Sequence, residues 1–323
     1  MRTVLTSFSV LLLALCVGCP GTPPAVPSFP GDPTPHIVNE AETNEAEPPV
    51  PITEESGDEP VAPAESAVEA RTARPSPAVA ADSASVPHPP LDALTQQIDL
   101  YVEALGTALE RLDGSRNYAE DAANVVRDAS GLALVALAVG LANDDSQYKK
   151  AAPHIITAAK TLVAAQNLEE GQSAFAGLKS ALGNTSEAPA LSWSDKIVGL
   201  KPAKSAIQSL NSAVKRTTDT ERKLNTLLTR QPQRVYPPLA ALAVLSQGMI
   251  PNVGETEKPD AVAEWKKYCE DFRNAALKVN AAAHQYAAAE SGDYSVYSAA
   301  MTAMAESCDD CHRTFYPSAV GQE

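Results

Sequence analysis

Apolar side chains recur every three or four residues from position 91 onward. The first such stretch places on one helical face Leu94, Ile98, Tyr101, Leu105, Leu109 and Leu112. The surrounding sequence is rich in alanine, the strongest helix former. No comparable stretch alternates apolar and polar residues with a period of two, the pattern of a half-buried strand. The pattern therefore predicts an all-α fold.

Turn signals divide this region into two sets of four helices, because clusters of Gly, Asn, Asp and Ser mark the expected ends. The first set is expected at 91–113, 116–142, 147–166 and 169–182, in a bundle over 91–187. The second is expected at 196–217, 220–249, 259–290 and 294–313, in a bundle over 191–317. Pro237 and Pro238 are expected to bend the helix over 220–249. These numbers and lengths are typical of antiparallel four-helix bundles.

Short segments of the first set reappear in the second. Ala136-Leu137-Ala138-Val139 returns as Ala241-Leu242-Ala243-Val244, at similar places in the order of helices and turns. The recurrence of the same residues, with turns at similar positions around them, indicates an internal repeat. We therefore expect two related four-helix bundles in tandem.

The amino terminus has the features of an export signal. Arg2 precedes an apolar run that ends in small residues before Cys19, and residues 1–18 are too short to span a membrane as a mature helix. The end of the run resembles a bacterial lipobox, with Gly18 before Cys19 and Cys16 where leucine is usual. We expect lipidation of Cys19 and a periplasmic, membrane-anchored lipoprotein. An ordinary cleaved signal would instead give a secreted protein.

Residues 19–90 differ from the rest of the chain in composition. Of the 26 prolines, 17 lie between Pro20 and Pro90, together with 12 acidic residues against two arginines. Such a segment buries too little apolar surface to offset its chain entropy, so we expect a disordered, acidic tether. It carries most of the net charge of −15. A chain without a basic stripe does not fit nucleic acid as a partner. Residues 318–323 are expected to form a tail.

The pattern with the clearest chemistry lies near the carboxyl end. Cys308-Asp309-Asp310-Cys311-His312 is a C-x-x-C-H motif, which is typical of c-type haem attachment. On a helix, Cys308 and Cys311 share a face and can form thioethers to haem, while His312 supplies an axial ligand to iron. The first set ends in Ala181-Leu182-Gly183-Asn184 without such a motif. The sequence therefore predicts one haem c per chain.

Three other interpretations of the motif remain open. A thiol oxidoreductase would place C-x-x-C at the start of a helix after a strand, whereas this motif closes a helix. A structural zinc site would need a fourth ligand beside Cys308, Cys311 and His312, which Cys269 or His284 could supply. The third interpretation is a chance match in an exported protein.

The segment from Ser307 to Phe315, with an aromatic residue three positions after His312, resembles the class II c-type cytochromes, the cytochrome c prime group. The resemblance covers residues 191–317. It implies a four-helix bundle with the haem on its last helix. It differs at Tyr316, where the family usually has arginine. Bundles of this family often pair, so the resemblance also implies a homodimer.

The resemblance further implies that the residue on the other side of the iron decides its behaviour, with a methionine from the first helix giving a low-spin electron carrier. Residues 196–216 contain neither methionine nor histidine, and they offer Ile207, Leu210 and Val214 to the bundle interior. The other candidates are His284, Lys204 and Met249. Met301 and Met304 share the helix of His312 and are expected to pack in the core. We therefore expect five-coordinate or weakly ligated iron.

The leading functional hypothesis is a lipid-anchored cytochrome that transfers single electrons to or from an unidentified redox protein. One alternative is a five-coordinate haem protein that binds nitric oxide or carbon monoxide. Another is a structural lipoprotein with an accessory haem or zinc site. No nucleophilic triad or phosphate-binding glycine loop points to an enzyme.

Overall fold

The computed structural model describes residues 88–112, 118, 122–289 and 292–317 of the 323-residue chain. These residues form helices, turns and connecting segments, and no strand occurs among them, which confirms the all-α prediction. The predicted signal over 1–18, the lipidation residue Cys19, the tether up to residue 87 and the tail over 318–323 lie outside the described residues.

The first helices are α1 (Leu91–Arg111), α3 (Ala123–Leu141), α4 (Ala152–Ala164) and α5 (Leu168–Ala181). The predicted helix over 147–166 begins later, because Pro153 lies in the first turn of α4, where a missing N–H costs no intrahelical bond. Asn167 begins α5: its Oδ1 accepts a hydrogen bond from the Glu170 N–H at 2.9 Å, while Glu170 Oε2 accepts one from the Gln166 N–H. In this set α1 and α4 pack on α3, and α5 packs on α4 and α1.

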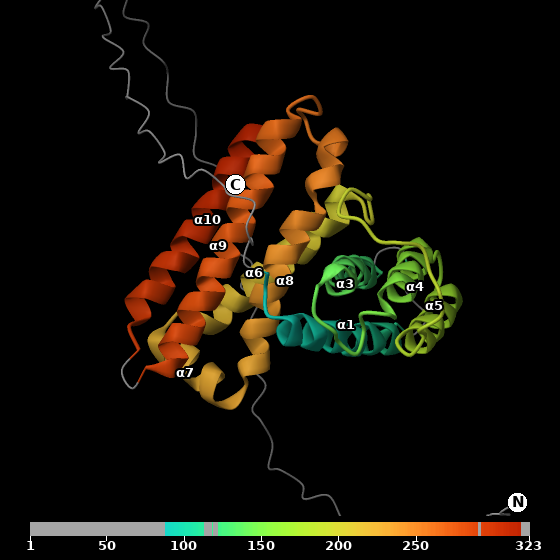
Figure 1. Cartoon of the computed structure of the whole chain (residues 1–323), viewed down its shortest axis with the longest axis horizontal. Coiled ribbons are helices and arrows are strands. Elements are labelled where there is room, and N and C mark those ends of the chain that lie inside the picture. Colours follow the sequence, from blue (N-terminus) through green and yellow to red (C-terminus); the bar gives the residue numbers. More distant parts are fainter. Residues whose placement is uncertain (1–87, 113–117, 119–121, 290–291, 318–323) are drawn as a thin grey trace, which may run out of the picture. The chain divides into compact units, whose positions relative to one another are not determined.

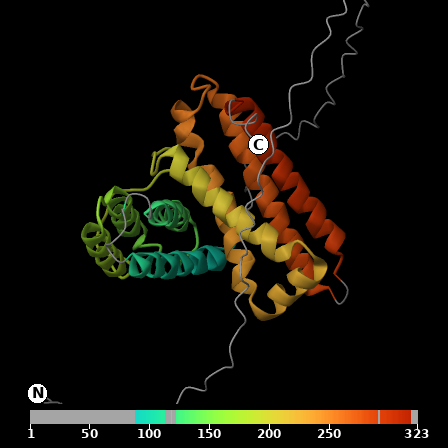
Figure 2. The ribbon, with the colours of Figure 1, turned by 180° about the vertical axis from the view of Figure 1, so that it is seen from behind.

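The later helices are α6 (Leu200–Thr218), α7 (Glu221–Arg230), α8 (Tyr236–Gly248), α9 (Val262–Ala288) and α10 (Tyr294–Phe315). Two short 3₁₀ helices, η1 (Pro232–Arg234) and η2 (Ile250–Glu255), flank α8. Figure 1 and Figure 2 show α9 and α10 side by side, in agreement with their extensive contacts. α8 packs between α6 and α9.

The prediction of a single bent helix over 220–249 is wrong. The chain leaves the helical conformation after Arg230 and forms a new helix, α8, with Pro237 and Pro238 in its first turn. Proline cannot donate to a preceding carbonyl, but the first N–H groups of a helix have no such partner anyway. The two prolines therefore start a helix rather than bend one.

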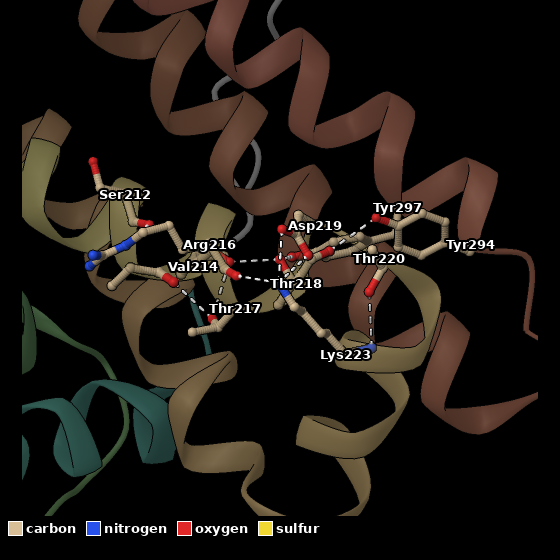
Figure 3. Close-up of polar contacts among 11 residues, drawn as sticks. Ser212, Val214, Arg216, Thr217, Thr218, Asp219, Thr220, Lys223, Tyr294 and Tyr297 are labelled. Atoms are coloured by element: carbon tan, nitrogen blue, oxygen red, sulfur yellow. Dashed lines mark hydrogen bonds and ion pairs between the residues drawn. The ribbon is translucent and has the colours of Figure 1, made fainter. Parts of the chain in front are cut away.

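Figure 3 shows how α6 and α10 are joined near the end of α6. Thr218 Oγ1 and the Tyr297 hydroxyl lie 2.8 Å apart in a buried hydrogen bond, and the Tyr294 hydroxyl donates to the Thr218 carbonyl at 3.0 Å. Thr220 then begins α7 by accepting a hydrogen bond from the Lys223 N–H. The end of α6 is thereby fixed to the beginning of α10, and the two helices run antiparallel.

The central helices of the two sets are α3 and α8, and they carry the repeated four-residue segments. Their side chains from 136 to 139 and from 241 to 244 are at most 3% exposed. Both helices belong to one continuous apolar core, and they contact each other where Gly248 lies close to Leu134. Within the described residues the two sets of helices therefore share a core.

One described helix, α3, is long and apolar enough to cross a membrane, with a mean hydropathy of 1.5 over its most apolar window. However, 72% of that window is buried inside the protein. The central helix of a soluble bundle has the same length and composition. The apolarity of α3 is therefore accounted for by the core.

Candidate functional site

The C-x-x-C-H motif occupies the last turns of α10. Asp293 starts this helix by accepting a hydrogen bond from the Ser295 N–H at 2.8 Å, and the Tyr316 N–H closes it on the His312 carbonyl at 2.8 Å. The regular helix between these ends places Cys308 and Cys311 one turn apart on the same face. Both thiols are half-buried and neither is in a disulfide.

Both cysteines and His312 line one cavity, which lies between α6 and α10. Its volume is about 230 Å³. α8 and α9 provide the rest of the wall, which is largely apolar. The lining residues are Lys204, Ile207, Gln208, Asn211, Ser246, Met249, Trp265, Tyr268, Cys269, Phe272, Ser307, Cys308, Cys311, His312 and Tyr316.

The antiparallel arrangement of α6 and α10 determines which residues face each other across this cavity. Ile207 and Cys308 each lie eleven residues from the Thr218–Tyr297 hydrogen bond, along α6 and α10 respectively. At a rise of about 1.5 Å per residue, both are roughly 16 Å from that bond. The same register pairs Lys204 with Cys311. The wall opposite the two thiols is therefore built by Lys204 and Ile207.

A small aromatic cluster supports the motif from the side of α9. The ring of Phe315 makes edge contacts with Trp265 at 5.1 Å and with Tyr268 at 5.9 Å between centroids. Trp265 Nε1 donates to the Met249 carbonyl at 3.1 Å, and the Tyr268 hydroxyl lies 3.0 Å from Thr314 Oγ1. With Trp265 and Phe315 almost fully buried, the end of α10 is held in one position against α9 and α8.

The two motif thiols are protonated at neutral pH. Burial raises the pKa of Cys308 to about 12 and that of Cys311 to about 11. Burial also raises the pKa of Cys269, which is 3% exposed. A thiol oxidoreductase needs the opposite shift, toward a reactive thiolate. This environment therefore does not support the oxidoreductase interpretation.

The ring of Tyr316 is in contact with both His312 and Lys204. His312 is exposed, and its ring stands at 89° to that of Tyr316 with 6.0 Å between centroids. Lys204 Nζ lies 3.3 Å from the centroid of the same tyrosine ring, a cation–π contact. Burial lowers the pKa of Lys204, although the nearby Cys311 and Glu257 oppose this shift. A lysine from α6 thus places a positive charge next to the ring of Tyr316.

The structure brings together only some of the residues that the sequence singled out. Ile207 and Lys204 line the cavity with Cys308, Cys311 and His312, whereas Leu210 and Val214 do not. Val214 is fully buried in the main core, and Leu210 packs against it. Residues 204–214 of α6 make about three helical turns, so only part of the apolar face of this helix points to the cavity.

His284 does not reach the cavity. It is exposed on α9 and stacks on Tyr236, with ring centroids 4.0 Å apart and an interplanar angle of 6°. Met301 and Met304 also lie away from the cavity wall, and Met304 is fully buried in the main core. The expectation that these two methionines pack in the core is confirmed.

Met249 is the methionine that sequence reasoning undervalued. It caps the end of α8, directly after Gly248, and its carbonyl accepts the hydrogen bond from Trp265 at the cavity wall. The prediction of one long helix over 220–249 hid this placement. Pro251, two residues later, had already marked the end of the predicted helix at 249.

The donor set and the walls fit a covalently held haem. Two adjacent thiols, one imidazole and an apolar wall surround the cavity, and the Ser307 and Tyr316 hydroxyls are buried without a hydrogen-bond partner. The cavity is smaller than the roughly 300–1,000 Å³ of typical ligand sites. A macrocycle there would be partly enclosed, which suits a group retained by covalent bonds.

The zinc interpretation finds less support. In the part of the chain that the structure describes, no three His, Cys, Asp or Glu side chains gather as a metal ion would require. His284, one of the two proposed completing ligands, stacks on Tyr236 instead.

No protein-family model, curated protein or solved structure matches the chain.

Proposed function

We propose that the chain is an exported, lipid-anchored c-type cytochrome that carries one haem c and transfers single electrons. In this proposal, two tandem four-helix bundles follow a disordered tether, and the second bundle holds the haem while the first holds none. The observation that carries the proposal is the cavity between α6 and α10, which is lined by Cys308, Cys311 and His312 at once. Sequence alone places these residues in a row but does not provide a cavity in front of them.

The chain's own residues have separate roles in this proposal. Cys308 and Cys311 would hold the haem through thioethers and His312 would ligate its iron, and the bound group would supply the single-electron chemistry. Trp265, Phe315 and Tyr268 hold the end of α10 in place. Ile207 and Phe272 exclude water from the apolar side of the cavity. Exposure of His312 leaves one side of the site open to a redox partner.

The test is attachment of haem in cells that contain the c-type maturation machinery. The unchanged chain is expected to carry haem that survives denaturing electrophoresis, with a mass increase equal to one haem. Cys308→Ala combined with Cys311→Ala is expected to abolish covalent attachment, since both thioethers are lost. His312→Ala is expected to alter the absorption spectrum.

His284→Ala is the matched control for His312→Ala, because this residue is a histidine of α9 that lies outside the cavity. Its spectrum is expected to equal that of the unchanged protein. A folded, helical, unchanged chain without haem would contradict the proposal, as would covalent haem in the double cysteine variant.

A gas-binding protein is the second candidate function, and the observation in its favour is Ile207 opposite Cys308. An apolar residue there offers no ligand to iron, and α6 has no methionine or histidine that could supply one. Carbon monoxide added to the reduced protein is expected to shift the main absorption band at once. If the shift occurs only after Met249→Leu, Met249 is the sixth ligand and the gas-binding function is excluded.

The lipid anchor is tested separately. Cys19→Ala is expected to abolish incorporation of labelled palmitate, whereas Cys16→Ala is expected to retain it, because only Cys19 follows the predicted cleavage position. Continued labelling of Cys19→Ala would contradict this part of the proposal.

A further inference from the structure

The segment in which α6 ends and α7 follows is strongly basic. Residues 215–234, which we call the basic stretch, hold six lysines and arginines against two carboxylates, whereas the whole chain has a net charge of −15. The six cations are all exposed, and they are Lys215, Arg216, Arg222, Lys223, Arg230 and Arg234. The acidic total of the chain conceals this local excess of positive charge.

The packing of α7 turns its arginines toward solvent. Leu224 is fully buried, and Leu227 and Leu228 pack against the main core. At about 3.6 residues per turn, Arg222 and Arg230 lie on the face of α7 that is turned away from these leucines. The fold therefore presents the basic stretch on the surface of the second set of helices.

Few carboxylates balance this charge. Asp219 pairs with Lys223 at 2.8 Å where α6 passes into α7, as Figure 3 shows. Glu221 accepts a hydrogen bond from the Tyr286 hydroxyl of α9 at 3.4 Å. The adjoining start of α10 adds Asp293. The cations still outnumber the carboxylates that the structure describes in this region.

The other end of α10 has the opposite charge. Its last turns hold the exposed side chains of Glu306, Asp309 and Asp310 against Arg313. In Figure 1, α7 lies at the end of the second set where α10 begins. Cys308 comes 14 residues after that beginning, about 21 Å along the helix. A protein that exchanges electrons at the cavity therefore does not account for the basic stretch.

We propose that the basic stretch binds an anionic phospholipid surface and so turns the C-x-x-C-H end of α10 away from the membrane. This inference rests on the lipid anchor of the proposed function, which brings the chain to a membrane, and deepens it. Each lysine or arginine near an anionic membrane surface adds to binding. The same surface repels the acidic end of α10. The exposed side of His312 is thereby left open to a redox partner.

The experiment places the full, lipidated chain in vesicles that contain a small amount of a phospholipid with a photoactivatable headgroup. The bulk lipid is either phosphatidylcholine alone or phosphatidylcholine mixed with phosphatidylglycerol. Cross-links to residues 215–234, mapped by mass spectrometry, are expected to increase with the anionic lipid by about fivefold or more, since a single cation near such a surface contributes about that factor.

Two double variants test whether the charges of α7 cause this increase. Arg222→Gln combined with Arg230→Gln is expected to remove most of it. Lys150→Gln combined with Lys160→Gln is the matched control, because it removes the same charge from exposed positions of the first set, and it is expected to keep the increase. Raising the salt concentration to roughly 0.5 M is expected to abolish the increase in the unchanged chain, because salt screens exposed charges.

Equal cross-linking in the two kinds of vesicle would overturn the inference, and so would equal losses in the two double variants. Cross-links at the C-x-x-C-H end in place of the basic stretch would overturn it as well. If the double arginine variant does not fold, as judged by its helical circular dichroism, the salt dependence of the unchanged chain decides. A chain that does not float with phosphatidylcholine vesicles has no lipid anchor, which overturns that part of the proposed function. Cross-linking in the anionic vesicles then still decides the inference, so the two failures are distinguishable.

Discussion

The α4–α5 pair and the α9–α10 pair come at corresponding places in the two sets of helices, but they differ in length. α4 and α5 have 13 and 14 residues, whereas α9 and α10 have 27 and 22. α9 contributes Trp265 and Cys269, and α10 contributes Phe315, to a second, small apolar cluster that Leu200 of α6 completes, and the C-x-x-C-H motif lies beside it. The central helices of the two sets are similar, but the site occurs in the second set only. It is built on the longer helices α9 and α10 and not on the core that the two sets share.

The shared core leads to the largest predicted effect. Leu137→Ala in α3 and Leu242→Ala in α8 each remove a fully buried side chain, and each is expected to lower the free energy of unfolding by about 2–5 kcal/mol. Because α3 and α8 belong to one continuous core, both variants are expected to shift the same single transition. Thermal unfolding followed by circular dichroism measures this. Two separate transitions, each moved by one variant only, would show that the two sets of helices fold independently.

The contact between α3 and α8 is tested by a pair of glycine substitutions. A Cβ added at Gly248 would lie 2.6 Å from Leu134 Cδ2, so Gly248→Ala is expected to lower the unfolding free energy by about 1–3 kcal/mol. Gly177 lies inside α5 with nothing within 4 Å of an added Cβ. Gly177→Ala is therefore expected to stabilise the protein by about 0.5–1 kcal/mol. Denaturant titration measures both, and equal signs for the two variants would refute the close approach of α8 to α3.

The hydrogen bond between Thr218 of α6 and Tyr297 of α10 is predicted to matter less for the free energy of unfolding than for the geometry of the cavity. Tyr297→Phe removes the buried hydrogen bond to Thr218, with an expected loss of about 0.5–1.5 kcal/mol. Tyr148→Phe is the corresponding change in the first set, where the bond from Tyr148 to Asp99 is exposed, and a smaller loss is expected. If this hydrogen bond sets the register of α6 against α10 at the cavity, only Tyr297→Phe changes the haem absorption spectrum. A change of spectrum in both variants would contradict that role.

The smallest effect concerns acid stability near the beginning of α6. The hydrogen bond from Lys196, together with those from the Leu200 N–H and Asn252, holds the pKa of Glu255 below its ordinary value despite some opposing burial. The stabilisation is therefore present above about pH 4.5 and is lost as the pH falls through the lower pKa of the folded state. At pH 7, Glu255→Gln is expected to cost at most about 1 kcal/mol, as for other partly exposed ion pairs.

Unfolding free energies at pH 7 and near pH 4 measure this effect. The difference between Glu255→Gln and the unchanged chain is expected to shrink toward the lower pH. Glu187→Gln, at an exposed position, controls for the loss of one negative charge. A difference that grows on acidification would contradict the assignment.

Much of the helical architecture follows from periodicity, but the helix ends depend on competing local signals. The predicted range 169–182 agrees with α5 within one residue at each end, because Asn167 and Glu170 form a capping pair. The range 220–249 failed because its long periodic pattern concealed a break at Gln231, and proline was interpreted as a bend rather than a start.

The side of the cavity that carries the C-x-x-C-H motif was predictable, and the opposite wall was not. Local spacing determines that Cys308, Cys311 and His312 share the end of one helix. Which residues face them depends on the register of α6 against α10, where Thr218 and Tyr297, residues far apart in the sequence, share a hydrogen bond. For the same reason Met249 and Lys204 gained importance from the structure, while His284 and Leu210 lost it.

The most direct test of the central claim is the haem content of the purified, matured chain. Conversion to the pyridine haemochrome, with protein determined on the same sample, gives the number of haems per chain and reports on their thioether linkage. The account predicts one haem per chain, in the spectral position of a doubly thioether-linked haem c. No haem in the folded protein would contradict the assignment of the site, and two haems per chain would contradict the distinction between the two sets of helices.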